Sequence, residues 1–152
     1  MGGLALVPND TPDFTIDQAG RILDDVLAPW IKDLALLVET IAPSAQGEPG
    51  AILRMPFSPR LCRDNGVVCG QALMAFADTA MVIAMVTASG GYRPMTTVDQ
   101  TTHFMRAIAS SDVLAEARVV RMGRTMSFGR VTLTGATDGK PAAMVSSAFA
   151  ML

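Results

Sequence analysis

The sequence has few thiols, few aromatic residues and few charges. Its two cysteines, Cys62 and Cys69, match neither a CxxC pair nor a zinc knuckle, and two thiols do not make a disulfide framework. Twelve basic residues are scattered among fourteen acidic ones, so no basic run marks a nucleic-acid surface. The composition therefore predicts a reducing compartment, no metal site and no nucleic-acid partner.

The first residues also lack the features of an export signal. No basic region followed by an apolar stretch and a cleavage site is found between Met1 and Pro12, which favours the cytoplasm. A chain of 152 residues has room for one sizeable core. We expect a flexible segment over residues 1–14 and a single domain over residues 15–152.

A long segment from Gly66 to Tyr92 carries only one charge, Asp78, and is long enough to cross a bilayer. A lone carboxylate at the centre of a lipid-facing helix costs roughly 2.5 to 3.5 kcal/mol on insertion scales. The residues that follow have the pattern of strands that need a surface to cover. We therefore expect a helix from about Cys69 to Gly90 that is buried in protein and has no membrane partner.

The other elements follow from periodicity and turn signals. Thr15 and Gln18 form a capping-box pattern at the start of a first helix, and Pro29 closes that helix or starts a new turn. The segment from Trp30 to Ala42 is ambiguous between a helical turn and a strand; we interpret it, with Ala51 to Phe57, as a two-stranded hairpin. Further strands are expected at residues 96–105, 113–121, 127–136 and 142–152, forming an antiparallel meander.

Together these elements predict an α+β fold in which a curled antiparallel sheet wraps a long central helix. One sheet edge stays open in this arrangement, and half of all residues are hydrophobic while only 17% are charged. Pairing of that edge with a second copy would complete the sheet and bury apolar surface. We therefore expect a homo-oligomer, either a dimer or a dimer of dimers.

Three segments resemble a known family. They are GQALMAFADTA at residues 70–80, TVD at 97–99 leading to FMR at 104–106, and DVLAEARVVRMGR at 112–124. From about Trp30 to the C-terminus the chain resembles the hotdog-fold thioesterases, specifically the PaaI-like group of acyl-CoA thioesterases. The resemblance implies a hotdog fold, a CoA thioester substrate, no cofactor beyond the coenzyme A of that substrate, and a site at a dimer interface.

The resemblance also assigns roles to particular residues. The family opens its central helix with His-Gly-Gly, followed seven residues later by a catalytic Asp; this chain has Cys69-Gly70-Gln71 and then Asp78. Cys69 thus replaces the His that helps to place the substrate carbonyl. Asn65 matches an upstream Asn of the group, and Thr97 matches a hydroxyl residue near the attacking water.

Thioester hydrolysis requires a carboxylate that activates water or attacks directly, and donors aimed at the carbonyl oxygen. The free amides of Gly70 and Gln71 at a helix N-terminus are suitable donors. Asp78 follows Gln71 by about two turns on nearly the same helix face. For Asp78 the alternative is a purely structural carboxylate bound to a neighbouring loop.

Other residues are candidates for substrate binding. Arg106, Arg121 and Arg124 are suited to the phosphates of coenzyme A, or are ordinary solvated strand ends. Met74, with Met81 and Met85, either lines an acyl tunnel or belongs to the core. Cys69 with His103 as its base is a less favoured nucleophilic pair.

The leading hypothesis is an acyl-CoA thioesterase that uses Asp78. Two alternatives remain open at this point: a non-catalytic acyl-CoA-binding hotdog protein, which the missing His favours, and a hotdog hydratase or dehydratase.

Overall fold

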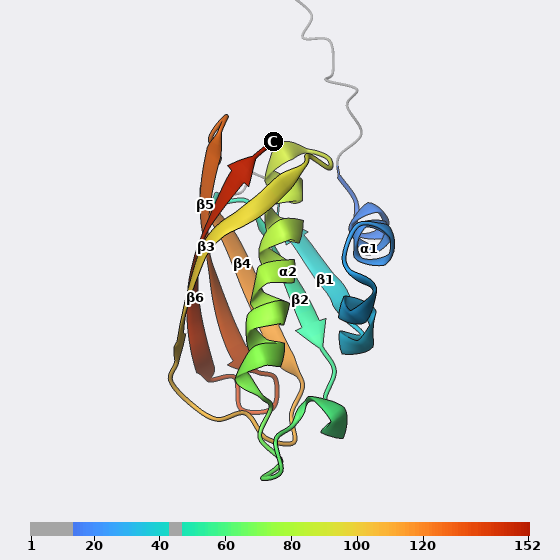
Figure 1. Cartoon of the computed structure of the whole chain (residues 1–152), viewed down its shortest axis with the longest axis vertical. Helices are drawn as coiled ribbons and strands as arrows, with labels where there is room; N and C mark the ends of the chain where they lie inside the picture. The colour runs from blue at the N-terminus through green and yellow to red at the C-terminus, as the bar shows by residue number, and fades with distance from the viewer. Residues whose placement is uncertain (1–13, 43–46) are drawn as a thin grey trace, which may run out of the picture.

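A computed structural model describes residues 14–42 and 47–152 (Figure 1). The flexible segment expected over residues 1–14 lies outside the described residues except for Phe14, as does part of the turn expected after Ala42. The elements in chain order are α1 (Ile16–Asp25), the 3-10 turn η1 (Pro29–Leu34), β1 (Leu37–Ala42), β2 (Gly50–Met55), the 3-10 turn η3 (Pro59–Leu61), α2 (Gly70–Ser89), β3 (Met95–Phe104), β4 (Val113–Arg121), β5 (Met126–Gly135) and β6 (Pro141–Met151).

The first helix and the hairpin occur where the sequence predicts them. The Thr15 hydroxyl accepts the Gln18 amide, and the Gln18 side chain accepts the Thr15 amide, which is the expected capping box. The ambiguous segment contains both structures: Pro29 begins the turn η1, and β1 starts only at Leu37. The prediction that a strand fills the whole segment is wrong, because Pro29 is suited to the start of a helical turn.

The six strands form one antiparallel sheet in the order β1-β2-β4-β5-β6-β3, curled around α2 (Figure 1). The prediction of a sheet wrapped around a central helix is confirmed. The prediction of a four-stranded meander is wrong, because β3 pairs with β6 and not with β4. Alternation of apolar residues shows which face of a strand is buried, but not which strand lies beside it.

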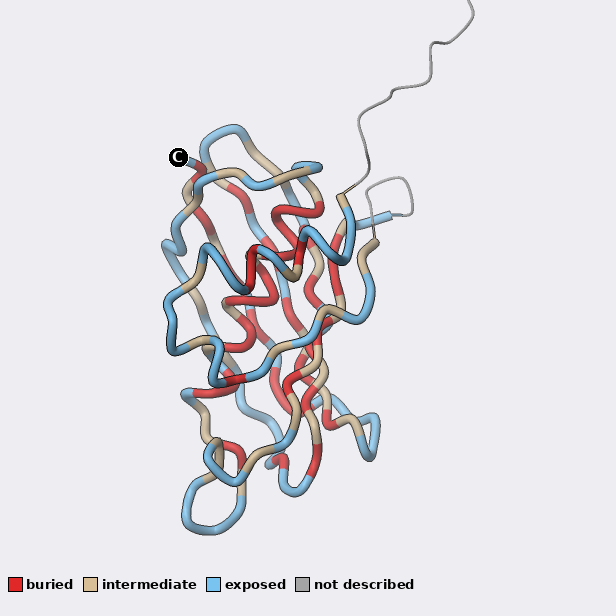
Figure 2. Tube along the Cα trace, turned by 90° about the vertical axis from the view of Figure 1, so that its right-hand side faces the viewer, coloured by how far each residue is buried: buried red, intermediate tan, exposed pale blue. Residues whose placement is uncertain are grey.

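The helix α2 forms the centre of the core. By length and composition it is able to cross a membrane, but 67% of its apolar window is buried inside the protein. Figure 2 shows this buried helix crossing the middle of the molecule. Met81 lies directly on Gly129 of β5, where an added Cβ would be 2.3 Å from the Met81 sulfur. The prediction that protein covers this helix is confirmed.

The two edges of the sheet differ in their surroundings. The helix α1 lies beside the edge strand β1 (Figure 1). The other edge, β3, is largely exposed along its length. Apolar side chains on and beside it are exposed, including Val98 at 58% and Met105 at 51%. This is the open edge that the sequence predicts.

Candidate active site

Asp78 lies on α2 beside the edge strand β3. Its side chain accepts a hydrogen bond from the Thr97 hydroxyl, with 2.8 Å between Thr97 Oγ1 and Asp78 Oδ1. The residue is half-buried, and within residues 14–42 and 47–152 no cationic side chain forms an ion pair with it. The structure thus brings together two of the predicted site residues, and the carboxylate keeps acceptor capacity for a water or a substrate.

Strand β3 follows the N-terminal half of α2 in the opposite direction. Beyond the contact at Asp78, Gln100 Nε2 donates to the Met74 carbonyl oxygen at 3.0 Å. Further along, Phe104 covers the first helical residue, since a Cβ at Gly70 would lie 3.2 Å from Phe104 Cζ. The sequence assigns no role to Gln100, and it places Phe104 only in a family-like segment. The orientation of both side chains depends on an irregularity in the β3 ladder between Thr97 and Asp99.

The N-terminus of α2 presents free amide donors. Cys69 is the N-cap, and its sulfur accepts the Ala72 amide at 3.4 Å. The Leu73 amide donates to the Cys69 carbonyl. Within the described part of the chain the amides of Gly70 and Gln71 have no acceptor. These two donors are therefore available to an oxygen that approaches the helix end.

A cleft of about 500 Å³ opens at this helix N-terminus. Its lining residues come from the loop before α2, the first turn of α2, the end of β3 and the segment after it: Arg63, Val67, Val68, Gly70, Gln71, Leu73, Phe104, Met105, Arg106, Ala107 and Ile108. The free amides and Arg106 thus share one cleft. Asp78 does not line it and lies two turns further along α2.

The loop before α2 is held by backbone pairing. The Arg63 amide donates to the Val67 carbonyl at 2.8 Å, and the Val68 amide donates to the Ile108 carbonyl at 2.9 Å. Asn65 is exposed, and its side-chain oxygen accepts the Val67 amide at 3.2 Å. Asn65 therefore shapes the turn at the rim of the cleft without lining the cleft itself.

The three predicted phosphate-binding arginines do not meet within one chain. Arg106 lines the cleft and also a neighbouring cavity of about 290 Å³ that includes Lys140. Arg121 and Arg124 flank Met122, whose sulfur contacts Ser89 at the C-terminal end of α2. A helix of 20 residues is about 30 Å long, so these two arginines lie at the far end of the molecule.

The alternative pair of Cys69 and His103 is not assembled. His103 is paired with the exposed Met144 on β6, so its side chain lies on the outer face of the sheet. Cys69 lies on the inner side, at the helix end that Phe104 covers. Among the residues that the structure describes, no group of three or more His, Cys, Asp or Glu side chains is placed to hold a metal ion.

The predicted acyl-binding methionines also differ in their positions. Met81 and Met85 are fully buried core residues. Met74 is 42% exposed and lies one turn before Asp78, so it is the only one of the three that a bound acyl group could contact at the surface.

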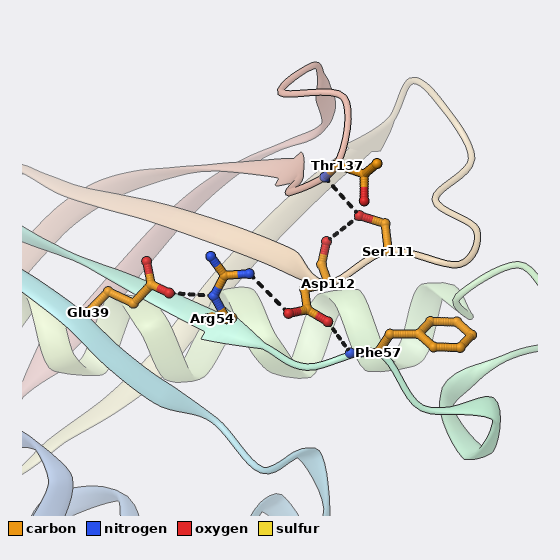
Figure 3. A network of polar contacts seen from close by, with 6 residues as sticks. All are labelled: Glu39, Arg54, Phe57, Ser111, Asp112 and Thr137. Atoms are coloured by element: carbon orange, nitrogen blue, oxygen red, sulfur yellow. Dashed lines mark hydrogen bonds and ion pairs between the residues drawn. The ribbon is translucent and has the colours of Figure 1, made fainter.

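A second polar cluster, separate from the cleft, joins β1, β2 and the residues just before β4 (Figure 3). Arg54 on β2 pairs with Glu39 and with Asp112, and Asp112 accepts the Phe57 amide at 2.7 Å. The Phe57 amide and the Arg54 guanidinium lower the pKa of the Asp112 carboxyl below its ordinary value. The hydrogen bonds to Glu39 and Asp112 raise the pKa of Arg54. Asp112, which begins the family-like segment at residues 112–124, thus has a structural role.

A family model described as the thioesterase superfamily matches residues 65–142. The match begins in the turn at Asn65 and extends over α2, β3, β4 and β5 to the first residues of β6. It therefore contains Asp78, Thr97, the free amides and every residue that lines the cleft except Arg63. No curated protein sequence matches the chain.

Several solved structures share the fold. Zebra fish thioesterase superfamily member 2 is 23% identical, with a TM-score of 0.76 over 91% of this chain and 99% of the fish protein. The Escherichia coli PaaI protein from the phenylacetic acid degradation operon is 16% identical, with a TM-score of 0.75 over 90% and 91% of the two chains. A thioesterase from Haemophilus influenzae is 16% identical, with a TM-score of 0.78 over 91% of each chain. The expected hotdog fold is confirmed.

Proposed function

This chain belongs to the thioesterase superfamily, and from that premise we propose that it hydrolyses an acyl-CoA to a free acid and coenzyme A. Asp78 is the general base or nucleophile, and the Gly70 and Gln71 amides stabilise the oxyanion. Thr97 positions the carboxylate and its water. Asn65, whose side-chain oxygen already accepts the Val67 amide, contacts the substrate from the rim of the cleft through its side-chain nitrogen. Hydrolysis changes no oxidation state, so the reaction needs no redox cofactor, and no role in it is assigned to a metal. We propose that it takes place in the cytoplasm.

One observation supports the proposal most directly. Asp78 is the only charged residue of α2, and among the described residues its carboxylate has no cationic partner and a single side-chain donor, a hydroxyl. Thr97 is that donor, at 2.8 Å. A carboxylate that served only the fold would be expected to have its oxygens occupied, because a buried charge is costly unless it is paired. The half-buried Asp78 instead has acceptor positions free for a water.

The proposed chemistry begins with a water bound to Asp78. The carboxylate removes a proton as the water oxygen attacks the thioester carbon, and the carbonyl oxygen becomes negative. Amide donors at a helix N-terminus stabilise that charge without having to reorient. Collapse of the intermediate breaks the carbon–sulfur bond, and the protonated Asp78 returns the proton to the leaving thiolate.

Within one chain, the Asp78 carboxylate is too far from the Gly70 and Gln71 amides for all of them to contact the same thioester. The separation of seven positions along α2 between Gln71 and Asp78 corresponds to about 10 Å, whereas each catalytic contact needs about 3 Å. The exposed edge of β3 lies beside Asp78 and is suited to pairing with a second copy. We therefore propose a homo-oligomer in which the amides of one copy face Asp78 of the other.

Substrate binding is proposed for the cleft and its rim. Arg106 is suited to a CoA phosphate, because a guanidinium pairs with phosphate through two parallel hydrogen bonds. Cys69 caps the helix beside the thioester, and Met74 contacts the acyl group. Arg121 and Arg124 contribute to phosphate binding only where another copy supplies them.

The experiment is Asp78→Asn, assayed by thiol release across short, medium and aromatic acyl-CoAs. We expect turnover to fall by about 100-fold or more, while acyl-CoA binding measured by calorimetry persists. Asp99→Asn, on the same edge strand, is the matched control and should retain turnover. If the wild-type protein binds acyl-CoA but never releases thiol, a non-catalytic binding protein is correct. Hydration of an enoyl-CoA without thiol release would indicate the hydratase alternative.

A further inference from the structure

Gln100 contacts the backbone of α2 one turn before Asp78. Its Nε2 donates to the Met74 carbonyl oxygen at 3.0 Å. In an α-helix the carbonyl of residue i accepts the amide of residue i+4, so the Met74 carbonyl also accepts the Asp78 amide. The Gln100 side chain therefore shares an acceptor with the peptide unit that carries Asp78.

An irregularity in β3 directs Gln100 toward the helix. Thr97 is paired with Phe149, but Asp99 is paired with the next residue, Ala148, so one extra residue is inserted in β3. After it, Gln100 is opposite the buried Ser147 and faces inward. Strict alternation from Thr97 would have placed Asp99 inside. The bulge therefore puts an amide, and not a second carboxylate, against α2 one turn before Asp78.

Three buried polar atoms around this contact lack a partner in the described part of the chain. They are Gln100 Oε1, Thr102 Oγ1 and Ser147 Oγ. Gln100 and Thr102 lie two residues apart on one face of β3, and Ser147 is directly opposite Gln100 and only 4% exposed. Buried polar side-chain atoms nearly always bond to protein or to ordered water. One acceptor and two hydroxyls match the hydrogen-bonding capacity of a single internal water, which typically makes about two to four bonds to buried polar groups.

We propose that Gln100 is a positioning residue for Asp78, held in place by an internal water that bonds to Gln100, Thr102 and Ser147. The inference rests on the proposed function of Asp78. Thr97 fixes the carboxylate of Asp78, and Gln100 fixes the backbone that carries it. Thr97 and Gln100, two donors from β3, thereby fix the position of the Asp78 carboxylate. This position matters because small misplacements of a catalytic group reduce rates strongly.

The test is Gln100→Met, which keeps the side-chain volume and removes both amide atoms. We expect kcat for acyl-CoA hydrolysis to fall by about tenfold while KM changes less than twofold, since the substrate cleft is untouched. Thr101→Val, on the outer face of the same strand, is the matched control. A Gln100→Met protein that unfolds more easily but keeps kcat within twofold of the wild type would overturn the proposal.

A second measurement does not depend on activity. Amide exchange by NMR should show that the Asp78 amide is exchanged at least fivefold faster in Gln100→Met, while the Ala84 amide further along α2 is unchanged. If the wild type shows no hydrolysis but this difference is present, the positioning role is retained and the proposed function is wrong. Unchanged Asp78 exchange would overturn the positioning role itself.

The internal water has its own test. A high-resolution crystal structure should show one water within hydrogen-bond distance of all three atoms in the wild type and none in Ser147→Ala. Direct bonds among the three side chains, or a polar atom of a bound acyl group in that place, would refute the water.

Discussion

Asp112 shows how one side chain joins segments that are far apart in the sequence. Its two oxygens accept the Phe57 amide and the Arg54 guanidinium, at 2.7 and 3.0 Å. Both donors favour the charged carboxylate and lower its pKa in the folded protein. A carboxyl with a lowered folded-state pKa stabilises the fold above its unfolded pKa, and this contribution is lost as the pH falls through the folded pKa.

Asp112→Asn should therefore lower the urea midpoint at pH 7, because the neutral amide loses the charge interaction with Arg54. The difference from the wild type should shrink below about pH 4, where the carboxyl of the unfolded wild-type chain becomes protonated. Asp64→Asn, in an exposed turn, is the control and should change neither midpoint. A difference that is the same at pH 7 and pH 3 would contradict this account.

At the scale of elements, two glycines have opposite effects on stability, because one has space for a side chain and the other has none. Gly20 lies inside α1, and nothing lies within 4 Å of the position that its Cβ would occupy. Gly50 begins β2, where a Cβ would lie 2.0 Å from the Ala117 carbonyl oxygen of β4. The first glycine lowers helix stability, and the second permits two strands to pair closely.

Gly20→Ala should raise the free energy of unfolding by about 0.5 to 1 kcal/mol, because alanine has the higher helix propensity. Gly50→Ala should lower it by about 1 to 3 kcal/mol or more, because backbone must move to admit the methyl group. Chemical denaturation of both variants compares them directly. A stabilised Gly50→Ala protein would show that β2 and β4 shift apart without cost.

At the scale of the whole molecule, the separation of Asp78 from the free amides suggests a site shared between copies. The proposal is testable with two inactive variants. Asp78→Asn removes the carboxylate, and Gln71→Pro removes one amide donor in the first helical turn, where proline is tolerated. Each mixed dimer would then contain one site with both an intact Asp78 and an intact Gln71 amide.

Co-expression of Asp78→Asn and Gln71→Pro should restore about a quarter of wild-type turnover, since half of randomly formed dimers are mixed and each has one intact site of two. Thiol release by the purified mixture, compared with each variant alone, gives the measurement. If the mixture stays as inactive as the single variants, the carboxylate and the donors belong to the same chain.

The local sequence pattern was sufficient for most elements of the fold. The capping box at Thr15 begins α1, and the Gly90 signal ends α2, because caps and turns depend on a few adjacent residues. The strand over residues 113–121 was predicted at its exact bounds, since its alternation reflects one buried face. The pairing of β3 with β6 was not predictable in this way, because it depends on contacts distant in sequence.

The candidate site likewise has features that the local sequence determines and features that depend on contacts distant in sequence. The sequence by itself determined that one carboxylate would lie in an apolar helix and that glycine and glutamine would begin that helix, because composition and capping are local properties. Only the tertiary structure decided that Thr97 donates to Asp78 and that Gln100 reaches Met74. The physical reason is the bulge in β3: one inserted residue reverses which side chains face the helix, and its position is set by packing of the sheet on α2.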